Sequence, residues 1–102
     1  MSKRPKMLAS VIREIVAPVL RECPRECGMV SLTEAEVSND FSHATLYVSA
    51  LREPDLALRF LEGRLPELQR SLGQLHRKRI PILRFRKDLR TERGIRIEEL
   101  LQ

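Results

Sequence analysis

The sequence predicts an α+β domain in which three helices cover one face of a three-stranded sheet. Apolar residues at helical spacing run through residues 6–20, and strand-like alternation occupies residues 29–50. Two short segments with apolar residues at helical spacing follow. After Pro81 comes a third segment in which apolar and polar residues alternate as in a strand. The expected order is therefore helix, strand, strand, helix, helix, strand, in a single domain that spans residues 1–102.

The first helix is expected from Lys6 to Leu20, with residues 1–5 and 98–102 loosely ordered. Its apolar stripe has the i, i+3, i+4 spacing that places side chains on one face: Leu8, Val11, Ile12, Ile15, Val16, Val19 and Leu20. Pro18 cannot donate a backbone hydrogen bond, so we expect a kink or an early end of the helix there.

Two strands are expected at Met29–Val37 and His43–Ala50, joined as an antiparallel hairpin through a turn at residues 38–40. Alternation is clean in the second strand, where Leu46 and Val48 face inward. In the first strand it changes phase between Leu32 and Ala35, which predicts a β-bulge.

Two helices in tandem should follow, the first beginning at Pro54. Gly63 and Pro66 interrupt the apolar pattern, so the chain should bend there, with Pro66 beginning the second helix. Pro81 prevents that helix from continuing and introduces a strand from Ile82 to about Arg86. Within this strand Leu83 and Phe85 should face the core, and the intervening arginines should face solvent.

Positive charge is concentrated near the C-terminus. Residues 76–93 hold eight basic and two acidic residues, a net charge of +6 against +5 for the whole chain. Such a focused field attracts polyanions, so we expect this block to bind RNA. Because the chain has only four aromatic residues, phosphate contacts should outweigh base stacking. The predicted RNA-binding residues, including three from the N-terminus, are Arg77, Lys78, Arg79, Arg84, Arg86, Lys87, Arg90, Lys3, Arg4 and Lys6.

Residues 34–62 carry the opposite charge, with six acidic residues and two arginines. Phosphates should repel this acidic region, and the repulsion should orient the protein on RNA.

Other functions have weaker support in the sequence. Cys23 and Cys27 lack the further ligands that a zinc site requires, and we interpret them as incidental thiols in a connection. Asp40, Ser42 and His43 lie close together without a nucleophile elbow or an oxyanion loop, so no catalytic residue, metal or cofactor is expected. No segment has the apolar length of a membrane span or of a signal peptide, which leads us to expect a cytoplasmic protein.

Two runs of the sequence carry a family resemblance. VSLTEAEVSNDFSHATLYVSAL, residues 30–51, and LQRSLGQLHRKRIPILRFRKD, residues 68–88, resemble the ribosome-binding factor A family in the order and spacing of their motifs. With the Arg-Gly-Ile at residues 93–95, the resemblance covers about residues 4–97. It implies a type II KH-like fold and a non-catalytic factor that binds the small ribosomal subunit and its ribosomal RNA during late maturation.

The resemblance is incomplete at the helix junction. The family has an Ala-x-Gly kink there, whereas this chain has Leu65-Pro66-Glu67, with Gly63 just upstream. We expect a monomer, and a protein-interaction module that acts through its sheet or helices without contacting RNA is the alternative function.

Overall fold

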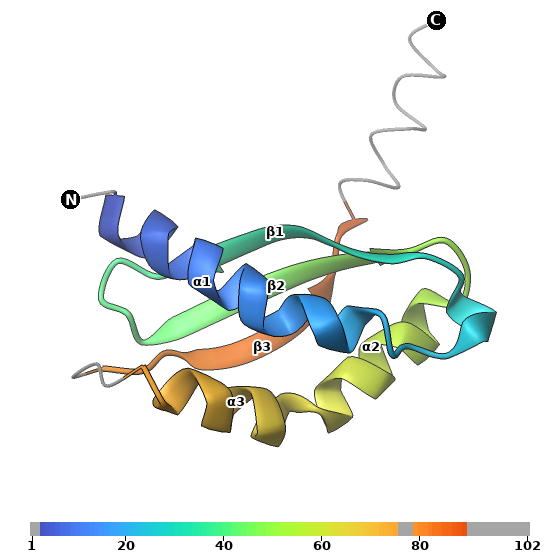
Figure 1. Ribbon diagram of the computed structural model, residues 1–102. Coiled ribbons are helices and arrows are strands. Elements are labelled where there is room, and N and C mark those ends of the chain that lie inside the picture. Colours follow the sequence, from blue (N-terminus) through green and yellow to red (C-terminus); the bar gives the residue numbers. More distant parts are fainter. Residues whose placement is uncertain (1–2, 76–78, 90–102) are drawn as a thin grey trace, which may run out of the picture.

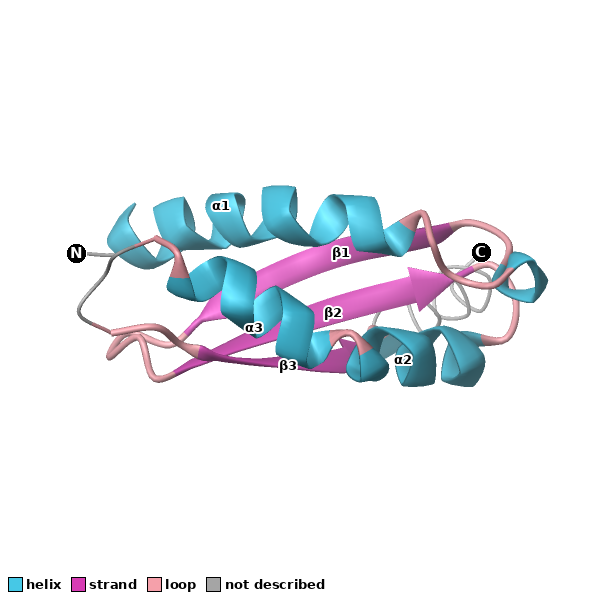
Figure 2. Cartoon of the chain, turned by 60° about the horizontal axis from the view of Figure 1, so that its bottom comes forward, coloured by secondary structure: helices cyan, strands magenta, loops and turns pink. Residues whose placement is uncertain are grey.

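The computed structural model describes residues 3–75 and 79–89, without the side chains of residues 3–5. Its elements are α1 (Lys3–Leu20), a short 3₁₀ turn η1 (Arg25–Cys27), β1 (Val30–Val37), β2 (His43–Ala50), α2 (Pro54–Gly63), α3 (Leu65–Gly73) and β3 (Ile82–Lys87). The helices α1, α2 and α3 lie on one face of the sheet, as Figures 1 and 2 show. The predicted fold class and element order are confirmed.

The sheet has the strand order β1-β2-β3. β1 pairs with β2 antiparallel, and β2 pairs with β3 parallel. A parallel pair needs a long crossover, which α2 and α3 supply as they return the chain across the sheet. The register of β1 on β2 shifts between Leu32 and Glu34, which confirms the predicted bulge.

α1 begins at Lys3, three residues earlier than expected, and ends at Leu20, two residues after Pro18. Pro18 lies on the exposed side of the helix, where water can satisfy the carbonyl group that loses its hydrogen bond. The opposite side buries Ile12 and Val16 against the sheet at 1% and 0% exposure. The N-terminus of the helix therefore extends into the segment that was expected to be loose, whereas residues 98–102 lie outside the described part of the chain.

The predicted bend of the chain is confirmed, since α2 ends at Gly63 and α3 begins at Leu65. The second helix starts one residue earlier than expected, which leaves Pro66 in its first turn, where its missing N–H costs nothing. Leu75 lies beyond the end of α3 but still packs against the core.

The core lies between the sheet and the helices. All four side chains that were expected to face inward from β2 and β3 are at most 4% exposed: Leu46, Val48, Leu83 and Phe85. The opposite face of the sheet, which we call the open face, carries no helix among the described residues (Figure 2). None of the described helices has the length and apolar character needed to cross a membrane.

Candidate nucleic-acid interface

The open face of the sheet displays two arginines on β3. Because side chains alternate along a strand, burial of Leu83 and Phe85 turns Arg84 and Arg86 to the opposite side, where both are exposed. Within the described part of the chain neither guanidinium forms an ion pair. No described carboxylate competes for either group, and a guanidinium can bind phosphate oxygens in a bidentate manner.

The same face becomes acidic towards β1. Across the sheet, Arg84 lies beside Thr45 and Arg86 beside Tyr47, and on the far side of β2 these residues pair with Glu36 and Glu34. Two rows of paired residues therefore cross the sheet from β1 to β3. One is Glu36, Thr45 and Arg84, and the other is Glu34, Tyr47 and Arg86. Strand pairing therefore places two glutamates of the acidic region on the same face of the sheet as Arg84 and Arg86, so the acidic and basic regions of the sequence are not fully separated in the structure.

Arg79 lies at the end of the sheet where β3 begins. Its Nη1 donates to the carbonyl oxygen of Asp40 at 3.0 Å, so it contacts the turn between β1 and β2. In that turn the hydroxyl of Ser42, the hydroxyl of Ser38 and the Ser42 N–H all donate to the Asp40 carboxylate. These hydrogen bonds lower the pKa of Asp40 to about 2. The carboxylate is ionised at neutral pH, so a negative charge lies in the turn that Arg79 contacts.

Lys87 occupies a different environment from the two arginines. Its Nζ donates to Asp55 on α2 at 2.8 Å, and this hydrogen bond lowers the pKa of Asp55. The ammonium group thus attaches the end of β3 to α2 and is partly neutralised. Lys87 is consequently a weaker candidate for phosphate binding than its neighbours on the strand.

The structure does not place the other predicted RNA-binding residues beside Arg84 and Arg86 on the open face of the sheet. Arg77, Lys78 and Arg90 lie outside the described residues, and Lys3 and Arg4 lie in the first turn of α1, without described side chains. Lys6 is exposed on α1, in the helical layer behind the sheet. The N-terminal end of α1, the turn between β1 and β2 and the start of β3 nevertheless lie at the same end of the molecule (Figure 1).

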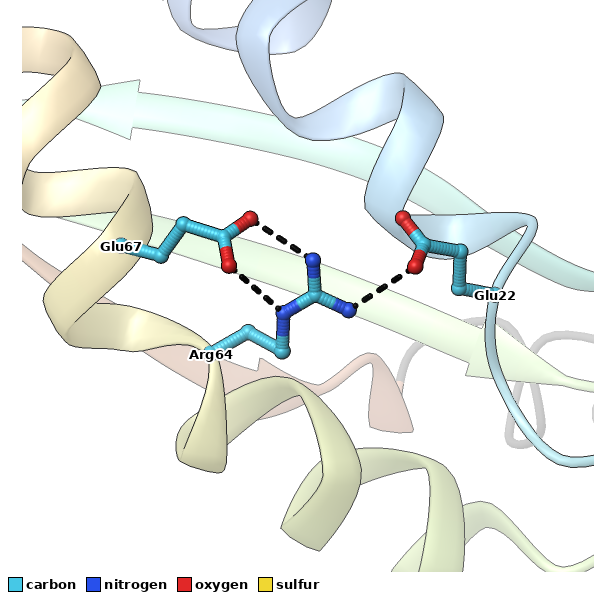
Figure 3. A network of polar contacts seen from close by, with 3 residues as sticks. All are labelled: Glu22, Arg64 and Glu67. Atoms are coloured by element: carbon cyan, nitrogen blue, oxygen red, sulfur yellow. Dashed lines mark hydrogen bonds and ion pairs between the residues drawn. The ribbon is translucent and has the colours of Figure 1, made fainter.

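The junction between α2 and α3 holds a network that the sequence did not predict. Nε and Nη2 of Arg64 contact the two carboxylate oxygens of Glu67 at 3.2 and 2.7 Å, and Nη1 contacts Glu22 at 3.2 Å (Figure 3). The hydrogen bond to Glu67 is the main cause that raises the pKa of Arg64, and the guanidinium also lies 5.7 Å from the centre of the Phe60 ring. Since two carboxylates share one guanidinium, Arg64 does not offer a free positive charge to phosphate.

A second unpredicted contact lies at the bulge in β1. The hydroxyl of Thr33, the bulged residue, donates to the carboxylate of Asp88 and lies 3.2 Å from the carbonyl oxygen of Tyr47. Asp88 follows β3 and is only 7% exposed, so this hydrogen bond helps to satisfy a buried charge. The phase shift in the sequence predicts the bulge, but no local pattern predicts its partner.

An open hollow lies along the second half of β3. Its wall includes Tyr47, Arg84 and Arg86 from the open face of the sheet, with Glu36 from β1 and Glu62 from α2. Acidic and basic groups therefore line it together.

A family profile described as Ribosome-binding factor A matches residues 4–101. A ribosome-binding factor A from Synechocystis sp. is 37% identical over an alignment that covers 98% of this chain and 81% of the relative.

Solved structures show the same likeness. The crystal structure of ribosome-binding factor A from Thermus thermophilus superposes with a TM-score of 0.67 at 25% identity, over 81% of this chain and 93% of that chain. A homology model of the Thermus thermophilus ribosome binding factor A, fitted into a cryo-EM map of its complex with the 30S subunit, gives a TM-score of 0.64 at 24% identity, over 76% of this chain and 88% of that chain.

Proposed function

This chain belongs to the ribosome-binding factor A family, and on that basis we propose that it binds the small ribosomal subunit as a non-catalytic assembly factor. It acts on ribosomal RNA during late maturation of the subunit, in the cytoplasm and as a monomer. The family name supports the ribosome as partner, and the Thermus thermophilus protein fitted into a 30S complex supports the small subunit.

One observation carries the RNA part of this proposal. Arg84 and Arg86 are exposed, project from the same face of one strand and have no carboxylate partner among the described residues. A planar guanidinium matches the geometry of phosphate, and it remains charged at any physiological pH. Rigid placement on a strand also limits the conformational entropy that is lost when the contact forms.

Binding should depend strongly on salt. Each phosphate neutralised by a cationic side chain releases condensed counterions, so the logarithm of the affinity falls linearly with the logarithm of the salt concentration. Replacing Arg84 and Arg86 together with Ala should weaken binding to purified small subunits and make this slope shallower, while the fold is retained because both side chains are exposed.

The matched control removes the same charge from another surface. Arg13 and Arg21 are exposed on and just after α1, in the layer behind the sheet, and their double replacement with Ala should change affinity and slope much less. Affinities at four or five salt concentrations, with circular dichroism to verify folding, make the comparison. If the two double variants weakened binding equally, net charge alone would explain the affinity. Arg84 and Arg86 would then have no specific part in RNA binding.

The timing of action needs a separate measurement. In sucrose gradients of cell extract, the protein should sediment with small subunits, and it should be enriched on those whose ribosomal RNA is still unprocessed. An even distribution over immature and mature subunits would contradict a role in late maturation.

A further inference from the structure

We propose that His43 and Arg84 hold one phosphate of the RNA between them on the open face of the sheet, and that protonation of His43 strengthens this contact. The inference rests on the proposed function and adds a pH-dependent residue to its phosphate-binding surface. Three features of the described residues carry it: the place of His43 in the sheet, the hydrogen bonds of its ring and the charges around it.

His43 lies on the same face of the sheet as Arg84. It is the first residue of β2, and burial of the next residue, Ala44, turns the His43 ring to the open face, where it is exposed. In the register of β2 and β3, His43 is level with Ile82, and Arg84 is two residues further along the neighbouring strand. Neighbouring strands are about 4.8 Å apart and residues two apart on a strand are separated by roughly 6.6 Å, so the two positions are roughly 8 Å apart. Both side chains are long enough to converge on one phosphate group from this spacing.

A chain of hydrogen bonds fixes the position of the proton on the neutral ring of His43. The hydroxyl of Ser42 has a single proton, which it donates to the carboxylate of Asp40 at 2.7 Å. The oxygen of this hydroxyl lies 3.0 Å from Nδ1 of His43, so it accepts a hydrogen bond from an Nδ1 that carries the proton. Nε2 of the neutral ring then has only a lone pair, which cannot donate to a phosphate oxygen. A second proton on Nε2 makes it a donor and gives the ring a positive charge, so phosphate binds the protonated ring more tightly.

The described charged groups around His43 balance one another until the ring is protonated. Arg84 on β3 is positive, and so is Arg79, which contacts the turn before His43 through its hydrogen bond to the Asp40 carbonyl oxygen at 3.0 Å. Asp40 in that turn and Glu36, which lies diagonally from His43 across β1 and β2, are negative. Asp40 stays ionised between pH 6 and pH 8, since its pKa is about 2. Protonation of His43 therefore changes this end of the open face from balanced to net positive charge.

Subunit binding should consequently depend on pH. Between pH 8 and pH 6 a histidine gains its charge, whereas arginine side chains and the phosphates of RNA keep theirs. The affinity of the full chain for purified small subunits should rise about fivefold over this range, the upper size of one exposed ion pair. The logarithm of the affinity should also fall more steeply with the logarithm of the salt concentration at pH 6, by up to roughly 0.7–0.9, because one more phosphate is neutralised.

Matched variants separate His43 from other titrating groups, because the titrating groups of the subunit affect all variants alike. His43→Gln should bind at pH 6 about as the unmodified chain does at pH 8. His43→Arg has a permanent charge, so at pH 8 it should bind about as tightly as the unmodified chain does at pH 6. The chain has two histidines, and His76→Gln should retain the pH dependence whatever its effect on the affinity itself. In an Arg84→Ala background the effect of His43→Gln should shrink, because the two side chains hold one phosphate together.

A second measurement uses the unmodified chain and a uridine dodecamer as the source of phosphates. If protonation of His43 strengthens RNA binding, bound RNA must favour protonation of His43 by the same factor. The ring resonances of His43 in NMR spectra are identified by their absence in His43→Gln, and a pH titration gives the midpoint of protonation. A fivefold effect on affinity corresponds to a midpoint about 0.7 pH unit higher with saturating RNA than without it. An unchanged midpoint would overturn the inference, whether or not the variants fold.

Failure of this inference can be distinguished from failure of the proposed function. If Arg84→Ala with Arg86→Ala weakens subunit binding, but the pH dependence is absent or is lost with His76→Gln instead, the role of His43 is overturned and the RNA-binding function stands. If the pH dependence follows His43 but the salt dependence is the same at both pH values, protonation acts without a phosphate contact and the shared phosphate is overturned. If neither His43→Gln nor the double arginine variant changes subunit binding at pH 6, phosphate binding by the open face is overturned as well.

Discussion

At the residue scale, the side chains of β3 alternate between the core and the exposed face of the strand. Phe85 is 4% exposed, whereas Ile82 at the start of the strand is 61% exposed. Phe85→Ala should lower the free energy of unfolding by about 3–5 kcal/mol, since it leaves a cavity in the core. Ile82→Ala is the matched control and should cost less than about 1 kcal/mol. Urea melts of both variants test the register, and similar losses would contradict it.

The backbone conformation just before β1 requires a glycine at position 28, because Gly28 has φ 67° and ψ −139°. A Cβ atom there would lie 3.2 Å from the Cβ of Leu51, and the positive φ is strained for any other residue. Gly28→Ala should therefore destabilise the fold by about 1–3 kcal/mol. Gly73→Ala, at the end of α3 with nothing within 4 Å of the new Cβ, should be neutral or stabilising by up to about 1 kcal/mol. In thermal melts, a loss of stability for Gly28→Ala and none for Gly73→Ala is the expected outcome.

Asp40 makes stability depend on pH. Its pKa falls from 3.8 to about 2 in the folded chain, chiefly because of the Ser42 hydroxyl, with further hydrogen bonds from Ser38 and the Ser42 N–H. A carboxylate with a lowered folded pKa stabilises the fold above its unfolded pKa, and this contribution is lost as the pH falls through the folded value. The stability advantage over Asp40→Asn should therefore be constant above about pH 5 and disappear between about pH 4 and pH 2. A difference that did not change with pH would show that the charged form has no special role.

At the element scale, Arg64 connects three parts of the chain. Its fork-shaped guanidinium reaches Glu67 on α3 and Glu22 after α1, and it lies over Phe60 on α2. A lysine is a single point charge and cannot hold both carboxylates in this way. The melting temperature should fall for Arg64→Ala and less for Arg64→Lys. The melting temperature should fall further for Glu67→Gln than for Glu22→Gln, because Glu67 receives two of the three hydrogen bonds. Identical melts for all four variants would show that the network does not stabilise the junction.

The elements themselves were largely predictable because each depends on a local pattern. Alternation identified the strands, Gly63 and Pro66 identified the break between α2 and α3, and a phase shift identified the bulge. The contacts that fix these elements in space were not predictable. Thr33 and Asp88 are 55 residues apart, and Glu22 and Arg64 are 42 residues apart, so no periodicity relates them.

The same limit applied to the candidate site. Alternation in β3 predicted that Arg84 and Arg86 would project together into solvent, and they do. The sequence did not show that strand pairing would place Glu34 and Glu36 on their face, with Tyr47 between. Charge counted along the chain separates acidic from basic regions, whereas the face of a sheet combines residues from all its strands.

At the scale of the whole molecule, both edges of the sheet carry a feature that opposes pairing with another chain. At the start of β3 the free edge is occupied by Gln69, whose side-chain amide donates to the Pro81 carbonyl at 2.7 Å and accepts from the Leu83 N–H at 3.0 Å. β1 forms the other edge, and its bulge at Thr33 interrupts the regular ladder that a partner strand would need.

Charge adds to this protection at the β1 edge. Antiparallel pairing of two β1 strands about Ala35 would place Glu34 of one copy opposite Glu36 of the other, and like charges directly opposite destabilise a strand pair. We therefore expect sedimentation equilibrium to give the monomer mass of 11.9 kDa at micromolar concentrations. Glu34→Thr with Glu36→Thr removes the repulsion and favours strand geometry, so this variant should self-associate. Glu14→Gln with Glu26→Gln removes two exposed carboxylates elsewhere and should stay monomeric. A dimer of the unmodified chain that persists across this concentration range would contradict this expectation. Either the acidic edge does not prevent pairing, or the copies associate through another surface. Crosslinking at Ala35→Cys would distinguish these two explanations.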